Sequence, residues 1–357
     1  MPEKSFLSKL HVTTVSNVDK LFFLQNILTM TKAGFSLDES LKTLSAQTKK
    51  KEFQNIILDL HQQVENGVSF HVSLKKYPHV FSELFVSMIA AGEVSGKLEE
   101  SLKQLLLQMK KSYALSKKIR NALMYPCIIV AAMVVLSIGM IIFVLPNMIK
   151  LYSESGFVLP LPTRIVINIS QFLIDHGWLV GIIAFILIVL FILIIRNNTG
   201  KIYWHKLLLK LPIFSGIIKK INLAKMSRTL NSLIATDLPI VEDFQIIAET
   251  LGNRIYRQHL SASTDNLKKG QSIASIFKTR PDLFPPVMTQ MINVGEQSGT
   301  LDHVTSELAE FYEDEVADTM ANLTVILEPL IMLIVGTGVA FMAVSVIYPI
   351  YALVDQI

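Results

Sequence analysis

One stretch of sequence occurs twice in this chain, and it restricts the possible folds more than any other feature. Residues 91–102 read AGEVSGKLEESL and residues 294–305 read VGEQSGTLDHVT. A fixed displacement of 203 positions relates Gly92, Glu93, Ser95 and Gly96 to Gly295, Glu296, Ser298 and Gly299. Such self-similarity indicates a duplicated structural unit.

The same displacement holds on both sides of this stretch. Upstream, the apolar positions of residues 23–44 match those of residues 226–247. Downstream, Pro126 corresponds to Pro329, and in both copies a long apolar run follows the proline. The sequence therefore predicts two copies of a helical soluble module, each leading into a membrane helix.

Three apolar runs are long enough to cross a membrane. Apolar residues make up 51% of the chain and charged residues 17%, and the mean hydropathy is +0.46. The uncharged runs cover residues 127–145, 178–195 and 330–347, close to the roughly 20 residues that a helix needs to span a bilayer. Because a backbone in lipid must satisfy its own hydrogen bonds, each run is predicted to be helical.

The flanking charges predict the orientation of these spans. Lysine and arginine gather before the first run and after the second, whereas only Lys150 and Arg164 lie between the two. Since basic residues stay in the cytoplasm, we expect a multi-pass protein of the cytoplasmic (inner) membrane with a cytoplasmic N-terminus and an extracytoplasmic C-terminus. Residues 1–20 contain no apolar run with a cleavage site, so no secretory signal peptide is predicted.

The soluble modules show helical periodicity. Apolar residues recur at spacings of three and four, as in Leu37, Leu41 and Leu44, and no stretch alternates as a half-buried strand does. The predicted fold class is an all-α membrane protein with two homologous cytoplasmic helical bundles and three transmembrane helices. The predicted parts are an N-terminal segment 1–20, module 21–124, transmembrane helix 125–147, extracytoplasmic loop 148–173, transmembrane helix 174–196, module 197–327, transmembrane helix 328–351 and extracytoplasmic tail 352–357.

The two modules differ in charge. Residues 1–124 contain 17 Lys and Arg against 11 Asp and Glu, a net charge of +6, whereas residues 196–328 contain 14 against 15, a net charge of −1. The basic excess suits attraction to the lipid bilayer or docking of an acidic partner. Direct nucleic-acid binding is not expected, because the lysines are not interleaved with aromatic residues. The acidic run at 311–318 suits a solvated helix face or a cation site.

The motifs of the chain favour a non-enzymatic protein. The sequence GEVSGK at 92–97 has too few residues between its glycines for a phosphate-binding loop and follows no predicted strand. The eight histidines show no metal-binding spacing. No cofactor or metal is therefore expected. The spans also lack the paired charges that an ion-coupled carrier needs.

Two interpretations of the repeated Gly-Glu-x-Ser-Gly turn remain open. In the first, Gly96 and Gly299 end a helix in a left-handed conformation, Ser95 and Ser298 cap the following helix, and the glutamates lie near its positive end. In the second, the glutamates are exposed for a partner or a cation. The candidate corner and partner-contact residues are Gly92, Glu93, Ser95, Gly96, Gly295, Glu296, Ser298 and Gly299, with Pro126 and Pro329 as candidate helix breaks.

These motifs carry a resemblance to a known family. The block FxxLFVxMIxxGExSGxLxxxL at 81–102, the Gly67–Ser69 pair and the Tyr125-Pro126 opening of the first span resemble the type II secretion F domain family. This family comprises inner-membrane platform proteins of type II secretion, type IV pilus and competence pseudopilus systems. The short N-terminal segment resembles the Gram-positive competence version.

The resemblance implies a membrane hub that usually forms homo-oligomers. Its implied partners are a cytoplasmic hexameric secretion ATPase and pilins or pseudopilins, whose assembly into a filament the ATPase would drive through this protein. The rival hypothesis is a duplicated membrane carrier, for which Ser137, Thr337 and Ser345 offer only a sparse polar site within the spans.

Overall fold

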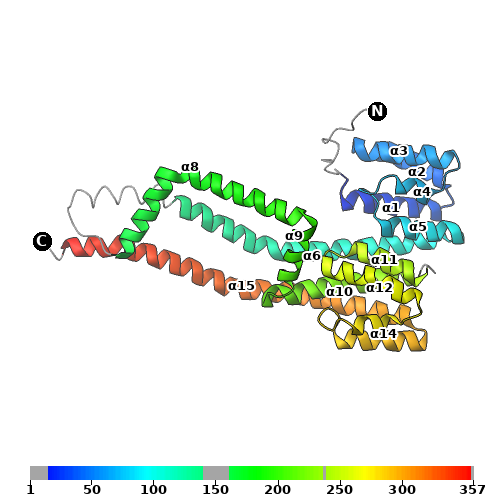
Figure 1. Ribbon diagram of the computed structural model, residues 1–357. Helices are drawn as coiled ribbons and strands as arrows, with labels where there is room; N and C mark the ends of the chain where they lie inside the picture. Colours follow the sequence, from blue (N-terminus) through cyan, green and yellow to red (C-terminus); the bar gives the residue numbers. More distant parts are fainter. Residues whose placement is uncertain (1–14, 140–160, 236–238, 355–357) are drawn as a thin grey trace, which may run out of the picture. The chain divides into compact units, whose positions relative to one another are not determined.

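The computed structural model describes residues 15–139, 161–235 and 239–354, and within these ranges the regular elements are all helices (Figure 1). The chain divides into two compact units. The first, called here the globular unit, comprises Met1–Ser116 with His205–Val316, and the second, the apolar unit, comprises Lys117–Trp204 with Ala317–Ile357. The fold class predicted from the sequence, with duplicated helical modules and three membrane-spanning helices, is confirmed.

Module 1 of the globular unit is built from six helices. They are α1 (Asn17–Lys32), α2 (Leu37–Gln47), α3 (Lys51–Glu65), α4 (Phe70–Lys75), α5 (Glu83–Ser95) and the first part of α6 (Leu98–Gly139). A capping box of Ser16 and Asp19 begins α1, and the Ser82 hydroxyl begins α5 by accepting from the amide of Phe85. The core is aromatic: the ring of Phe23 packs on those of Phe53 and Phe81.

Module 2 repeats this arrangement. Its helices are α10 (Pro212–Ile234), α11 (Ile240–Thr250), α12 (Arg254–Lys268), α13 (Ile273–Lys278), α14 (Pro286–Ser298) and the first part of α15 (Leu301–Val354). The helices α11 to α14 begin and end 203 residues after α2 to α5. The core keeps its aromatic character, with the ring of Phe284 packed on those of Phe277 and Tyr256.

The two modules pack together within the globular unit. The sequence predicted two separate bundles and did not predict this contact between them. Helix α5 of module 1 packs against α11 of module 2, and α6 lies between the other helices of module 1 and α10–α11 (Figure 1). The first parts of α6 and α15 run through the unit in the same direction (Figure 1).

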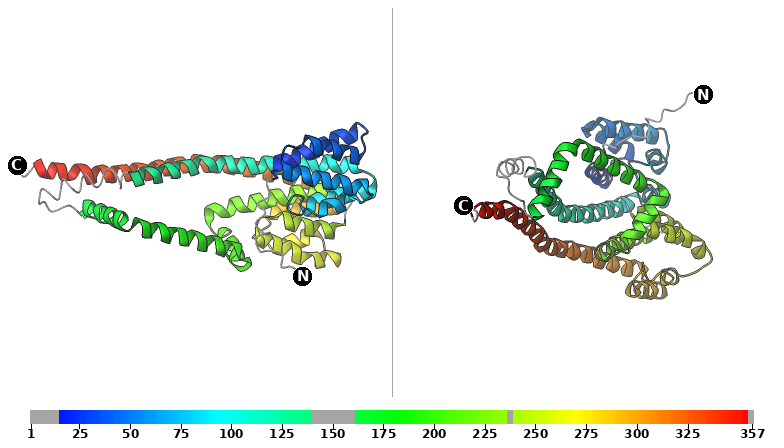
Figure 2. Two further views of the ribbon diagram at one scale, coloured as in Figure 1. Left: turned by 90° about the horizontal axis from the view of Figure 1, so that it is seen from above. Right: turned by 60° about the vertical axis from the view of Figure 1, so that its left-hand side comes forward.

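The apolar unit holds the parts of the chain that are suited to lipid. Among the residues that the structure describes, three helices are long and apolar enough to cross a membrane, with candidate stretches Leu98–Leu136, Asp175–Ile195 and Leu301–Thr337. Large apolar side chains such as Leu136, Phe185 and Leu333 point outward from these helices, as lipid-facing side chains do. Figure 2 shows α6, α8 (Leu161–Arg196) and α15 as long helices; α9 (Asn198–Leu208) follows α8.

The start of α8 differs from the expected loop. The extracytoplasmic loop was predicted to end at residue 173, but α8 already begins at Leu161. Its backbone departs from helical geometry at His176, with φ −120° and ψ 16°. The residues before His176 are amphipathic and those after it are uniformly apolar, so the break falls where the character of the sequence changes.

Candidate functional site: the repeated corners and the module junction

Each repeated corner contains a left-handed glycine. Gly96 ends α5 with φ +70° and Gly299 ends α14 with φ +69°. A side chain is penalised in this conformation, so glycine is the favoured residue there. This part of the sequence-based interpretation is confirmed in both copies.

The corner glutamates cap a different helix from the one predicted. Both oxygens of the Glu93 carboxylate accept backbone hydrogen bonds, from the amide of Phe70 at 2.7 Å and from that of His71 at 2.8 Å. These amides are the free donors at the start of α4, where the helix dipole favours a negative charge. The expectation that the glutamate serves the following helix, α6, is therefore wrong.

The second copy has the same cap. The Glu296 carboxylate accepts from the amides of Ile273 at 2.6 Å and Ala274 at 3.0 Å, at the start of α13. The copies differ in one contact: in module 1, His71 Nδ1 lies 2.5 Å from a Glu93 oxygen, whereas its counterpart in module 2 is Ala274. Both glutamates thus link two helices inside a module. Their role as partner contacts remains a prediction.

The corner serines do not cap the following helices. The Ser95 hydroxyl donates to the carbonyl of Ala91 at 2.7 Å, and the Ser298 hydroxyl donates to that of Val294 at 2.8 Å. Each serine is the last residue of its own helix, so its nearest acceptor is the carbonyl one turn earlier. The predicted serine caps are therefore wrong.

Gly92 and Gly295 allow close packing of neighbouring helices. A Cβ atom added to Gly92 would lie 2.6 Å from the Cβ of Ser101 on α6, and one added to Gly295 would lie 3.1 Å from Cγ2 of Val304 on α15. The first distance is too short for any side chain. The two glycines therefore set how closely α5 approaches α6 and α14 approaches α15.

The candidate helix breaks do not interrupt their helices. Pro126 lies inside α6 and Pro329 lies inside α15, and both helices continue past the proline. Each helix therefore runs without a loop from the globular unit into an apolar segment.

The module junction contains a buried polar cluster that the sequence analysis missed. The Gln108 side chain of α6 donates to Thr229 at 3.3 Å and accepts from Ser232 at 3.0 Å, both on α10. All three residues are buried. A buried amide with satisfied hydrogen bonds favours one packing arrangement over its alternatives. The only signal in the sequence was a glutamine one turn after two core leucines, Leu105 and Leu106.

A largely buried ion pair lies next to this cluster. The Arg228 guanidinium of α10 donates two hydrogen bonds to the Glu313 carboxylate of α15, at 2.8 Å and 2.9 Å. The ammonium of Lys111 from α6 lies 3.9 Å from the same carboxylate. Glu313 belongs to the acidic run at 311–318, so this part of the run forms an internal contact.

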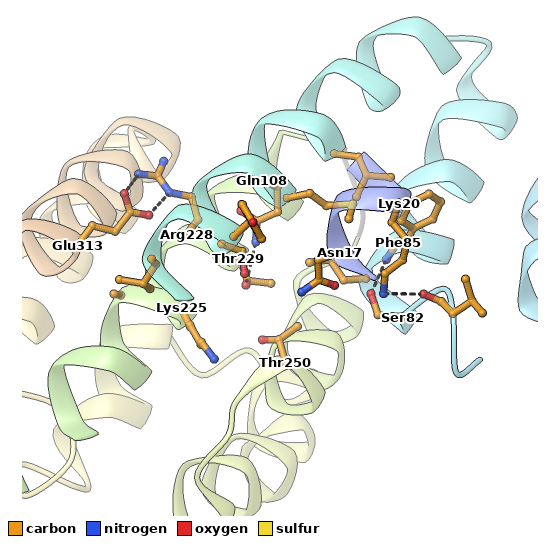
Figure 3. A pocket seen from close by; sticks show the side chains of 18 residues that line it. Asn17, Lys20, Ser82, Phe85, Gln108, Lys225, Arg228, Thr229, Thr250 and Glu313 are labelled. Atoms are coloured by element: carbon orange, nitrogen blue, oxygen red, sulfur yellow. Dashed lines mark hydrogen bonds and ion pairs between the residues drawn. The ribbon is translucent and has the colours of Figure 1, made fainter. Parts of the chain in front are cut away.

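A cavity of about 280 Å³ opens beside the junction (Figure 3). Asn17, Lys20 and Phe85 line it from module 1, and Lys225 and Thr250 line it from module 2. Burial lowers the pKa of the Lys20 and Lys225 ammonium groups from the usual lysine value. The Lys20 ammonium donates to the carbonyl of Val80 at 3.0 Å.

The described residues were also compared with the usual make-up of a metal site. Among the residues that the structure describes, no group of three or more His, Cys, Asp or Glu side chains could hold a metal ion. Cys127 is exposed on α6 and forms no disulfide.

Known proteins are similar to this chain along nearly its whole length. The family model described as type II secretion system (T2SS), protein F, matches residues 23–146 and again residues 226–349. The two matches begin and end 203 residues apart, which is the displacement that relates the repeated corners.

Relatives in two kinds of machinery are similar to this chain. The type IV pilus assembly protein PilC of Myxococcus xanthus is 30% identical over 344 residues, covering 96% of this chain and 82% of that protein. The type II secretion system protein F of Aeromonas hydrophila is 29% identical, with coverages of 93% and 86%. The protein transport protein HofC homolog of Escherichia coli is 29% identical, with coverages of 93% and 83%.

Proposed function

Because the chain belongs to the type II secretion system protein F family, we propose that it is the membrane platform of a type II secretion or type IV pilus-like assembly machine. In this role it couples a cytoplasmic secretion ATPase to the assembly of pilins or pseudopilins. It performs no chemistry itself and transmits displacement from the motor to the filament.

The observation that supports this proposal is the continuity of α6 and α15. Each helix begins in the globular unit and extends into a segment apolar enough to span a membrane. Within the globular unit, hydrogen bonds link α6 to α10, and the ion pair links α10 to α15. A motor that turns or pushes the globular unit would therefore move two membrane helices together.

The proposed orientation places the globular unit in the cytoplasm, where a secretion ATPase is found. It rests on the basic residues that flank the first two spans. The N-terminus is then cytoplasmic and the C-terminus extracytoplasmic. Assembly of a competence pseudopilus for DNA uptake is the more specific form of the proposal and stays a prediction.

Co-purification and filament assembly test the proposal together. A tagged full-length chain is expected to bring down the secretion ATPase from solubilised membranes of its own cells, and deletion of its gene is expected to abolish pilin assembly. A tagged three-span protein of another family serves as the control for the purification. Normal filament yield in the deletion strain would contradict the proposal. Transformation yield in the same strain tests the DNA-uptake form.

A further inference from the structure

The junction between the modules joins two different faces. Module 1 contributes α5 and α6, and module 2 contributes α10 and α11. In the duplicated scheme, α10 and α11 are the counterparts of α1 and α2, whereas α5 and α6 are the counterparts of α14 and α15. The junction is therefore head-to-tail: the last two helices of module 1 meet the first two helices of module 2. The last two helices of module 2 and the first two helices of module 1 are the counterparts of these faces and lie outside the junction.

The counterpart face on module 2 is exposed and more apolar. Gln108 is buried in the junction, but the residue 203 positions later, Phe311 on α15, is 52% exposed. Leu84 on α5 is likewise buried, and its counterpart on α14, Val287, is 64% exposed. Phe311 and Val287 thus expose apolar surface on the two helices whose counterparts are buried in the junction, as expected for a binding surface.

The counterpart face on module 1 is exposed as well. Ser232 and Arg228 of α10 are buried in module 2, whereas their counterparts on α1, Thr29 and Gln25, are exposed. Lys225 lines the junction cavity, and its counterpart Phe22 is 52% exposed. Both modules nevertheless have a contact between their first and last helices. In module 1, Lys110 donates to Gln25 at 2.9 Å, and the corresponding residues in module 2 are Glu313 and Arg228.

We propose that a second copy of this chain docks its α1–α2 face on the exposed α14–α15 face of the first copy, repeating the internal junction between chains. In that contact Phe311 takes the place of Gln108, and Thr29 of the next chain takes the place of Ser232. Phe22 and Phe311 replace Lys225 and Gln108 around the cavity, so two aromatic rings occupy the space that is a partly polar cavity inside one chain.

Charge does not oppose this pairing. The acidic residues of α1 and α2 (Asp19, Asp38 and Glu39) balance their lysines (Lys20, Lys32 and Lys42), whereas the face on α15 belongs to the acidic run at 311–318. A neutral face does not repel an acidic one, whereas like charges disfavour pairing of the α15 face with itself.

The direction of the helices also permits it. α6 and α15 run in the same direction through the globular unit (Figure 1). If the next chain docks as module 2 docks on module 1, its α6 and α15 therefore point to the same side as those of the first chain. Copies anchored in one membrane require that arrangement. Head-to-tail contacts of this kind close into a ring or continue as an open array. The inference rests on the proposed platform role only in that both copies share a membrane.

Cysteine cross-linking between differently tagged chains tests this contact. Cys127 is first replaced by alanine in the full-length protein. One chain then carries Thr29→Cys and the other Phe311→Cys, and isolated membranes containing both are treated with a short bifunctional thiol reagent. A linked dimer carrying both tags is expected. Chains with Thr29→Cys alone or Phe311→Cys alone are expected to give no linked dimer, because neither face meets itself.

Two controls make the result decisive. Gln108→Cys with Ser232→Cys in one chain is expected to link internally, which reports an intact junction. Leu58→Cys, an exposed apolar position on α3 outside the proposed face, replaces Thr29→Cys as the matched control and is expected to remove the dimer. Asn26→Cys, the counterpart of Thr229, provides a second position should Thr29→Cys disturb folding.

Three results would overturn the proposal. The first is a linked dimer in a sample that contains only one of the two variants. The second is the absence of the mixed dimer with both Thr29→Cys and Asn26→Cys while the internal pair links, and the third is failure of the internal pair to link in protein of normal abundance. Filament assembly does not enter these measurements. A linked dimer in cells that assemble no filament would therefore contradict the platform role and leave the docking contact standing.

Discussion

The guanidinium of Arg228 and the carboxylate of Glu313 form a two-pronged ion pair whose side chains are only 8% and 14% exposed. The pair joins α10 to α15 beside the module junction. Module 1 fills the same two positions with Gln25 and Lys110, which share a single hydrogen bond. Both modules therefore have a side-chain contact at these two positions, but its chemistry differs. The contact is an ion pair in module 2 and a single hydrogen bond in module 1.

We expect Glu313→Gln to lower the free energy of unfolding of the globular unit by about 3 kcal/mol, because it leaves the buried Arg228 charge without its partner. Hydrogen exchange of the most protected amides in α10 and α15 of the detergent-solubilised protein measures this change.

Glu315→Gln is the matched control for this substitution. Glu315 pairs with Lys220, but both side chains are about one-third exposed, so the loss is expected to be at most about 1 kcal/mol. Equal effects of the two substitutions would show that burial of the Arg228–Glu313 pair contributes nothing.

The corner glutamates give a second prediction. Gln in place of Glu93 keeps one carbonyl oxygen but turns an NH₂ group towards one of the two amides at the start of α4. The loss of a charge-assisted hydrogen bond is expected to lower stability by about 1–3 kcal/mol. Glu296→Gln is expected to behave similarly, since its carboxylate accepts the same two bonds. Thermal unfolding followed by circular dichroism checks both.

Filament yield at equal protein abundance separates architecture from partner binding. If Glu93 also contacts a partner, Glu93→Gln abolishes assembly in protein that is present at a normal level, whereas Glu296→Gln does not. Assembly that survives in the double variant would leave only the capping role.

The sequence predicted the parts of the fold that depend on local chemistry or on the repeat. The left-handed conformation of Gly96 could be predicted, because a glycine after a helical run has a specific conformational reason to be there. The displacement of 203 residues likewise predicted that α11 to α14 would reproduce α2 to α5. Apolar runs of the length of a bilayer predicted the membrane helices without reference to any partner element.

Contacts between distant segments could not be predicted in the same way. Glu93 lies 23 residues from the amide of Phe70 that it caps, and the short helix α4 carries no distinctive pattern of its own. Arg228 and Glu313 are 85 positions apart, and each resembles an ordinary surface charge in the sequence. The module junction depends on which faces meet, and the pattern of apolar positions inside one module contains no information on that choice.

A third prediction concerns the close approach of α5 and α6. Gly92→Ala places a Cβ 2.6 Å from that of Ser101 and 3.2 Å from the Cα of Leu98, so the helices must separate. We expect a loss of about 1–3 kcal/mol in stability, as for other overpacked positions. Thermal unfolding of the purified protein measures it.

Compensating substitutions identify the cause. Ser101→Gly removes the atoms in the way and is expected to recover part of the loss in Gly92→Ala. Gly295→Ala meets the side chain of Val304 at 3.1 Å, so its effect is expected to be smaller and to be relieved by Val304→Ala. A loss in Gly92→Ala that Ser101→Gly leaves unchanged would contradict the steric explanation.

The orientation of the chain gives a fourth prediction. With Cys127 replaced, a cysteine at Ser153 (outside the described residues) is expected to react with a membrane-impermeant thiol reagent in intact cells. A cysteine at Asn198, where α9 begins, is expected to react only after the membrane is opened, because basic flanks keep this side in the cytoplasm. Labelling with the opposite pattern would reverse the assigned topology.

The last prediction rests on Asp243, a buried aspartate in α11 whose counterpart in module 1 is Ser40. Its Oδ1 atom has no hydrogen-bond partner among the described residues. Burial, with a smaller contribution from the charge of Glu242, raises the pKa of the Asp243 carboxyl to about 7 from an ordinary value of 3.8. The folded protein therefore binds this proton more tightly than the unfolded chain does.

Stability is then expected to fall as pH rises from about 4 to about 7, because over this range the unfolded chain releases the proton and the folded protein retains it. A difference of about three pKa units corresponds to at most about 4 kcal/mol. Asp243→Asn removes the titrating group and is expected to raise the thermal unfolding midpoint at pH 8 while changing it little at pH 4.5. Asp265→Asn, at an exposed position on α12, is the matched control and is expected to change neither value. An unfolding midpoint of the Asp243→Asn protein that varies with pH as steeply as that of the unmodified protein would show that Asp243 does not titrate between the two states.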